Sequence, residues 1–209
     1  MVTRTSYHHG ALRDALLAAC LRLIETEGIA AVSLRRVARE AGVSTAAPYH
    51  HFPDRAALLA TLSTQGYQLL AVRLAAARAE ATTPMGALTA LARSYFRFSR
   101  EQPAYFRLMF RPELSQPDKH PAAMAAGDAA FAVLTDAIAE CVRAGVLPAD
   151  KADTLAVMYW GLSHGLASLR LDGQLEKRAE QFGTTTSDLA DDVMRTFAIL
   201  IEPGAPPLT

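Results

Sequence analysis

The sequence contains little cysteine, and its two cysteines lie far apart. Cys20 and Cys141 form no CxxC pair, so neither a structural zinc site nor a disulfide framework is expected. Free cysteines usually behave as small buried hydrophobes. The adjacent His50 and His51 would point about 100° apart on a helix, which disfavours a shared metal ion. We therefore expect no metal site and no cofactor.

Long apolar runs are also absent. No stretch of about eighteen residues is both apolar and uncharged, so we expect no membrane-spanning helix. The first twenty residues carry Arg13 and Asp14 within their apolar stretch and lack a small-residue cleavage site. These features predict a cytoplasmic protein.

The chain has no net charge, with 21 basic and 21 acidic residues. Their distribution is uneven, because residues 1–60 hold seven arginines against five acids and the remainder is slightly acidic. This weak polarity has the sign expected for an N-terminal part that faces phosphates.

Strand-like alternation of useful length is missing, and apolar residues recur at helical spacing instead. Leu12, Leu16, Ala19 and Leu23, for example, share one face of a helix. The pattern predicts an all-α protein. Its nine helices are expected at about 10–26, 33–41, 44–50, 54–80, 84–100, 103–110, 122–144, 150–171 and 187–202. The polar segment 174–186 is expected to be non-helical.

Residues 28–59 are the most informative part of the chain. Two short helices are joined there by the sequence AGVS at 41–44, in which Gly42 can adopt an unusual backbone angle. Such a helix-turn-helix leaves its second helix protruding, so that the leading end can enter a major groove.

The same segment resembles the TetR (tetracycline repressor-like) family. The resemblance rests on many positions at fixed spacing: Gly28, Ser33, Val37-Ala38, residues 41–44, Tyr49, His51-Phe52, Arg55 and Leu58-Leu59. It implies a nine-helix architecture whose last two helices form a dimer's four-helix bundle. Residues 7–10, 46–49 and 159–166 are further similar to a subgroup with a Trp…His-Gly element in its C-terminal body.

The resemblance implies a helix-turn-helix DNA-binding domain at 1–55 and a ligand-binding and dimerisation domain at 56–209. Within the first domain, Ser33 would cap the second helix and meet a phosphate, and Arg35 would reach a base edge or a phosphate. The first turn of the recognition helix would contact bases through Thr45, Ala46 and Ala47. Tyr49 and His50 would lie along the DNA backbone, and Arg55 would bind a phosphate.

Pro48 departs from the family pattern, because many relatives have Leu at this place in the recognition helix. As the fourth residue of that helix, Pro removes the hydrogen bond to the carbonyl of Ser44. The set of base contacts therefore stays open.

Two interpretations of Trp160 and His164 remain open. They lie four residues apart on one helix face, where they either line a ligand cavity or belong to the core. On the first interpretation, the ligand-binding residues are aromatic, Met and His side chains of the body: Tyr95, Phe106, Phe110, Met124, Trp160 and His164.

The sequence thus predicts a homodimeric regulator, most simply a repressor that a small apolar molecule releases from a palindromic operator. The dimer would form through helices 150–171 and 187–202, the latter contributing Leu189, Val193, Phe197 and Leu200. An enzyme is not expected, because the GxSxG-like residues 161–165 fall within a helix and do not follow a strand. The alternatives are a helical hydrolase or ligand carrier with a protein-interacting head, and an architectural DNA-binding protein that responds to no ligand.

Overall fold

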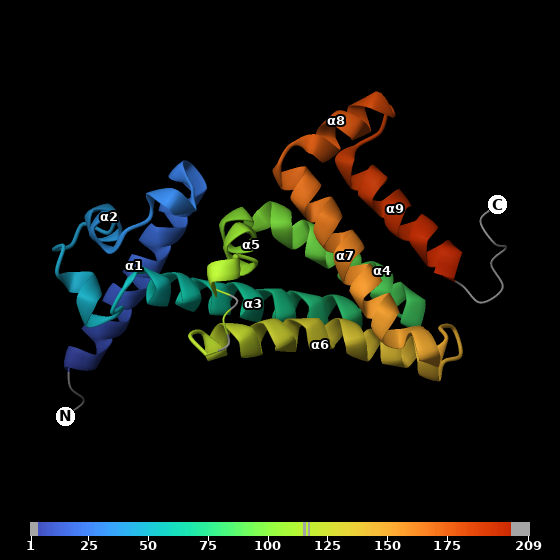
Figure 1. Ribbon diagram of the computed structural model, residues 1–209, viewed down its shortest axis with the longest axis horizontal. Helices are drawn as coiled ribbons and strands as arrows, with labels where there is room; N and C mark the ends of the chain where they lie inside the picture. The colour runs from blue at the N-terminus through green and yellow to red at the C-terminus, as the bar shows by residue number, and fades with distance from the viewer. Residues whose placement is uncertain (1–3, 115, 117, 202–209) are drawn as a thin grey trace. The chain divides into compact units, whose positions relative to one another are not determined.

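The computed structural model describes residues 4–114, 116 and 118–201, with side chains from residue 11 onward. Residue 202, the last of the predicted ninth helix, and the side chains of residues 7–10 lie outside the described residues. Within the described part every regular element is helical and no strand occurs, which confirms the all-α prediction (Figure 1). The α-helices are α1 (Arg4–Glu27), α2 (Leu34–Glu40), α3 (Arg55–Ala79), α4 (Pro84–Glu101), α5 (Pro103–Met109), α6 (Pro121–Arg143), α7 (Ala152–Leu171), α8 (Gln174–Gln181) and α9 (Thr186–Ile201).

The number of α-helices in the described residues matches the predicted nine, but two elements differ. The third predicted helix, at 44–50, contains only the 3₁₀ turn η2 (Ala47–His50). The polar segment after residue 173 forms α8, which was expected to be non-helical. This helix is amphipathic but short, and it buries only Leu175 and Ala179, so its apolar periodicity spans a single turn.

The chain divides into two compact units by packing. The first comprises the described residues of 4–67 and 103–126, so it joins the helix-turn-helix to α5 and the start of α6. Helix α1 packs against α2 and α5. Its core contains the fully buried side chains of Leu16, Val37, Leu58 and Leu108. The predicted boundary after residue 55 separates a DNA-binding domain from a ligand-binding domain, which is a division by function and not by packing. This boundary stays a prediction.

The second unit comprises the described residues of 68–102 and 127–201. Helix α4 begins at Pro84 after the N-cap Thr83, whose hydroxyl accepts a hydrogen bond from the Gly86 N–H. Its buried face, including Leu88, Leu91 and Phe98, packs mainly against α7. Helix α9 packs against α4, α7 and α8.

Helix α6 is long and apolar enough to cross a membrane by length and composition alone. Its apolar character comes largely from alanine, and it carries Asp128 and Asp136 at exposed positions. Asp136 forms an ion pair with Arg78 of α3. Because a carboxylate is costly at the centre of a bilayer, these two residues support a helix that lies outside a membrane.

Candidate nucleic-acid interface

The turn after α2 has the geometry that its sequence predicts. Gly42 adopts a φ of 71°, in the left-handed region that favours glycine. Its N–H donates to the carbonyl of Arg39, and the N–H of Val43 donates to the carbonyl of Ala38, 2.9 Å away. These two bonds form a Schellman motif, which ends the helix and satisfies its last carbonyls. The chain therefore leaves α2 in one fixed direction.

Residues 45–50, here called the recognition segment, follow this turn. Thr45, Ala46, Tyr49 and His50 are exposed, with Tyr49 at 53 %, and Ala47 is half-buried. In contrast, the side chain of Pro48 is fully buried in the first unit. The segment is thus attached through one proline and presents four side chains to solvent.

Pro48 also explains why this segment contains a 3₁₀ turn. Its ring nitrogen carries no hydrogen, so the i→i−4 bond to the carbonyl of Ser44 cannot form. That carbonyl instead accepts from the N–H of Ala47 at 3.0 Å, and the N–H of Tyr49 donates to Ala46 at 3.2 Å. Both bonds span three residues, as in a 3₁₀-helix. The predicted loss of the Ser44 bond is confirmed.

Helix α2 presents two residues of the predicted interface. Ser33 is its N-cap and accepts a hydrogen bond from the Arg36 N–H, which confirms the predicted cap. Arg36 forms an ion pair with Glu27 of α1. By contrast, Arg35 is exposed and forms no ion pair within the described residues. Arg35 is thus the more available cation for an outside partner.

Arg55, the eighth predicted DNA-binding residue, directs its guanidinium to backbone carbonyls of its own unit. Its Nε donates to the carbonyl of Val32 at 2.9 Å, and its Nη2 donates to the carbonyl of Ile29 at 2.8 Å. The side chain is partly buried by these contacts. The sequence gives no sign of this arrangement, because the partners are backbone atoms 23 and 26 residues away.

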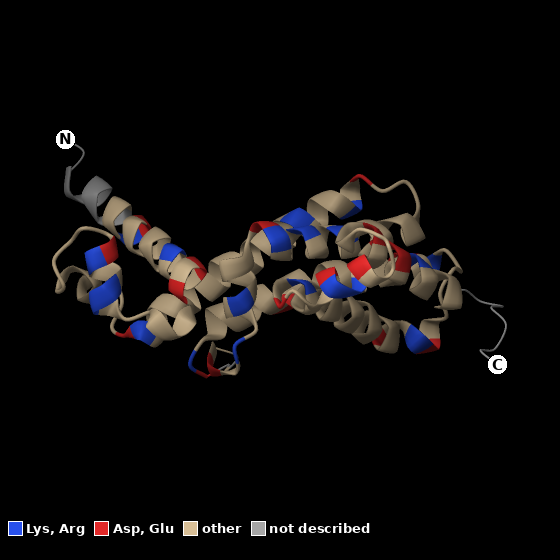
Figure 2. Ribbon diagram, turned by 90° about the horizontal axis from the view of Figure 1, so that it is seen from above, with Lys and Arg blue, Asp and Glu red and all other residues tan. Residues whose placement is uncertain are grey.

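Charges of both signs are interspersed over the helices of each unit (Figure 2). In the first unit, Arg22 pairs with Glu40 at 3.0 Å, which links α1 to α2. Arg13 lies over the ring of Phe52, 5.5 Å from its centroid, and so links α1 to the residues after the recognition segment. These contacts connect α1 to α2 and to Phe52, which follows the recognition segment.

The six predicted ligand-binding residues fall into two groups. Phe106, Phe110 and Met124 belong to the first unit, where the rings of Phe106 and Phe110 are 5.3 Å apart. Tyr95, Trp160 and His164 belong to the second. There the Tyr95 hydroxyl and His164 Nδ1 are 2.9 Å apart, and the Trp160 ring is 6.3 Å from that of His164. Trp160 is 40 % exposed and also contacts Phe131.

Burial lowers the pKa of His164 below its ordinary value of 6.5. The folded chain therefore binds fewer protons at this residue than the unfolded chain does in mildly acidic solution. Consequently, the stability that His164 contributes is present above pH 6.5 and is lost as the pH falls below that value. We expect the free energy of unfolding to fall less steeply between about pH 7 and 5 in His164→Gln than in the wild type. Urea denaturation at several pH values measures this slope, and equal slopes would contradict the assignment.

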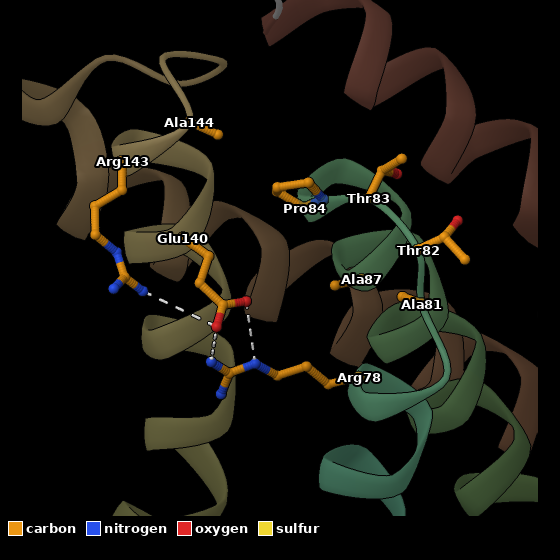
Figure 3. Close-up of a pocket in the computed structure, with 9 residues that line it drawn as sticks. All are labelled: Arg78, Ala81, Thr82, Thr83, Pro84, Ala87, Glu140, Arg143 and Ala144. Atoms are coloured by element: carbon orange, nitrogen blue, oxygen red, sulfur yellow. Dashed lines mark hydrogen bonds and ion pairs between the residues drawn. The ribbon is translucent and has the colours of Figure 1, made fainter.

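A groove of about 530 Å³ lies at the ends of α3 and α6 and the start of α4 (Figure 3). Arg78 and Arg143 approach the carboxylate of Glu140 from two sides, and the Arg78 guanidinium holds the pKa of Glu140 below its ordinary value. None of the six predicted ligand-binding residues lines this groove. Sequence reasoning missed it, because Arg78 and Glu140 lie 62 residues apart and form no motif.

Comparisons with known proteins match both parts of the chain. The profile described as "Bacterial regulatory proteins, tetR family" matches residues 16–62, which contain the helix-turn-helix. The profile described as "Tetracyclin repressor-like, C-terminal domain" matches residues 88–197, more than half of the chain.

Individual relatives agree with these profiles. The HTH-type transcriptional regulator BetI of Rhizobium meliloti (strain 1021) is 39 % identical over 92 residues, a match that spans 44 % of this chain and 45 % of BetI. A Rhodococcus sp. RHA1 protein of unknown function is 32 % identical, with a TM-score of 0.81, over 94 % of this chain and 98 % of that one. The fold is shared with the TetR family transcriptional regulator PfmR of Thermus thermophilus, at 22 % identity and a TM-score of 0.68 over 89 % of this chain and 96 % of PfmR. The chain therefore belongs to the TetR family of bacterial regulatory proteins.

Proposed function

We propose that the chain is a ligand-responsive DNA-binding transcriptional regulator, a repressor that a small, largely apolar molecule releases from a palindromic operator. The observation that carries this proposal is the recognition segment, which the Schellman turn at Gly42 fixes beside α2 with four side chains exposed. The family consists of regulatory proteins and not of enzymes. Membership of this family confirms the expected DNA-binding regulator and speaks against a hydrolase.

Seven of the predicted DNA-binding residues are proposed as contacts, and all of them except the half-buried Ala47 are exposed. Thr45, Ala46 and Ala47 would face base edges in the major groove, where a hydroxyl can bond a base and a methyl can touch thymine. The exposed Arg35 would reach a guanine or a phosphate. Ser33, Tyr49 and His50 would contact phosphates, which position the head without specifying sequence.

Thr45→Val tests the groove-facing position. The substitution removes the hydroxyl and keeps the shape, and because Thr45 is exposed it should leave the fold intact. We expect the preference at one base pair to change by about 0.5–1.5 kcal/mol, the value of one neutral hydrogen bond, with the other positions unaltered. Selection of bound duplexes from a randomised library reads the preference directly, and an unchanged profile would count against a base contact by Thr45.

The proposed homodimer forms through α7 and α9, the helices that correspond to the last two predicted ones. Six of the ten large apolar side chains that are exposed in the described residues lie there: Val157, Met158, Trp160, Leu169, Ile199 and Leu200. Val157 and Leu169 flank Gly161 and Gly165 at four-residue spacing along one face of α7, and both glycines have open space at the Cβ position. A concentration of exposed apolar residues of this kind marks a protein interaction surface.

Of the four side chains predicted for this seam on α9, Leu200 is 44 % exposed. Leu189, Val193 and Phe197 are half-buried, and the Phe197 ring packs on that of Tyr159 at 4.9 Å. We propose that these three half-buried side chains pack beneath the exposed residues of the dimer interface and fix the orientation of α9.

Release requires a ligand that binds the non-DNA-binding conformation more tightly. We propose that the effector contacts Tyr95, Trp160 and His164 in the second unit. Phe106, Phe110 and Met124, which belong to the first unit, stay predicted ligand contacts. The paired Tyr95 hydroxyl and His164 imidazole would supply its polar contact. Movement of α3, which begins at Arg55 and continues into the second unit, would carry the change to the DNA-binding residues. We further propose membership of the Trp…His-Gly subgroup and a cytoplasmic location.

The proposal is tested by DNA binding at two salt concentrations. The duplex is the DNA that flanks the protein's own gene, and the affinity is measured by fluorescence anisotropy. We expect specific binding that weakens steeply with salt, because each phosphate contact releases counterions. A protein that bound this duplex no more tightly than a scrambled duplex would contradict the operator, and a screen of small molecules that failed to release any bound DNA would favour an architectural role.

A further inference from the structure

The guanidinium of Arg55 faces the protein's own backbone. Arg55 is the first residue of α3, and its two hydrogen bonds to the carbonyls of Val32 and Ile29 use donors on both Nε and Nη2. Two bonds from one planar group fix both its position and its orientation. The positive charge therefore has a defined internal role before any DNA is present.

The two carbonyls lie between the helices of the head. Ile29 begins the 3₁₀ turn η1 (Ile29–Ala31) between α1 and α2, and Val32 immediately precedes Ser33, the N-cap of α2. Arg55 thus joins the first turn of α3 to the start of α2. Because α2 leads through the Gly42 turn into the recognition segment, this contact is one of the links between that segment and the start of α3.

The electrostatic surroundings agree with an internal cation. Burial raises the pKa of the Cys20 thiol to about 12, and the positive charge of Arg55 opposes this rise. A backbone hydrogen bond and the Arg111 side chain lower the pKa of Glu113, which follows α5, and the charge of Arg55 adds a smaller contribution in the same direction. The charge of Arg55 therefore affects the pKa values of one residue in α1 and one residue after α5, both within the first unit.

We propose that Arg55 is a positioning residue that locks α3 to α2, and not a phosphate-binding cation as the family resemblance implies. This inference rests on the proposed DNA-binding function. A lysine at this position would keep the charge but is a compact point charge without a planar fork. A lysine can bind a phosphate but cannot reproduce both carbonyl bonds in one plane. Arg55→Lys therefore separates the phosphate-binding role from the positioning role.

The test compares Arg55→Lys and Arg55→Gln on the duplex that flanks the gene, over a range of salt concentrations. We expect both variants to bind about tenfold more weakly, because each loses the two bonds and fewer heads are in the competent position. The slope of log affinity against log salt should stay at the wild-type value in both. If Arg55→Lys keeps the wild-type affinity, or if Arg55→Gln lowers the slope by about 0.9, the phosphate role is correct and the proposal is overturned.

A second measurement needs no DNA and so separates this inference from the proposed function. Thermal unfolding should show a lower Tm for Arg55→Lys and Arg55→Gln alike. Arg35→Gln is the matched control, since Arg35 is an exposed arginine of the same head without an ion pair in the described residues, and its Tm should equal that of the wild type. Unchanged Tm values for both Arg55 variants would overturn the positioning role even if the wild type failed to bind DNA.

Discussion

Gly42→Val should destabilise the first unit by about 2 kcal/mol and weaken DNA binding at least about tenfold. A Cβ at this position would meet nothing within 4 Å, so the cost does not come from a clash with a neighbour. It comes from the φ of 71°, which a β-branched residue adopts only with considerable strain. The turn can relieve that strain only by changing its backbone angles, which would displace the recognition segment.

Gly42→Asn is the matched control, because asparagine tolerates the left-handed region far better than valine does. We expect it to retain most of the stability and DNA affinity of the wild type. Urea unfolding and fluorescence anisotropy on the duplex that flanks the gene measure the two quantities. If the two variants lose stability equally, backbone strain at Gly42 is not the cause.

Val157→Glu should convert the proposed dimer into a monomer. Val157 is 58 % exposed on α7, so the substitution is compatible with the folded chain but would bury a charge in the interface between two copies. Because a dimer engages both operator halves at once, we expect the affinity for a palindromic operator to fall about a hundredfold. Analytical ultracentrifugation reports the mass, and anisotropy reports the affinity.

The chain offers an identical substitution elsewhere as a control. Val72 is 67 % exposed on α3, which is not one of the helices proposed for the dimer, so Val72→Glu adds the same charge to another helix. This variant should stay dimeric and bind the operator as the wild type does. A dimeric Val157→Glu, or a monomeric Val72→Glu, would place the seam elsewhere.

The features that could be predicted from the sequence are those fixed by local backbone chemistry. Ser33 as a cap, Gly42 as a left-handed residue and Pro48 as the residue that removes a helical bond all act within a few positions of themselves. Helix α8 escaped prediction because only Leu175 and Ala179 mark its buried face. The sequence predicts that Pro48 removes the hydrogen bond to the Ser44 carbonyl, but it does not predict the 3₁₀ turn that results.

The candidate sites were harder to predict where they depend on tertiary contacts. The guanidinium of Arg55 bonds to backbone carbonyls, which any residue type at positions 29 and 32 would supply. No pattern of side chains in the sequence therefore predicts this orientation. Likewise, a list of aromatic residues could not say that Tyr95 pairs with His164 and that Phe106 packs with Phe110 in the other unit. Residue type shows which side chains suit a cavity, whereas packing decides which of them meet.

The buried ring of Pro48 has a consequence for how this head diversifies. Within the recognition segment only Pro48 is buried, whereas the neighbouring Thr45, Ala46, Tyr49 and His50 are exposed and contribute little to the core. Exchanges at such surface positions usually alter folding energy by no more than about 0.5 kcal/mol. New binding preferences can therefore accumulate by mutation around the proline without first endangering the scaffold that displays them.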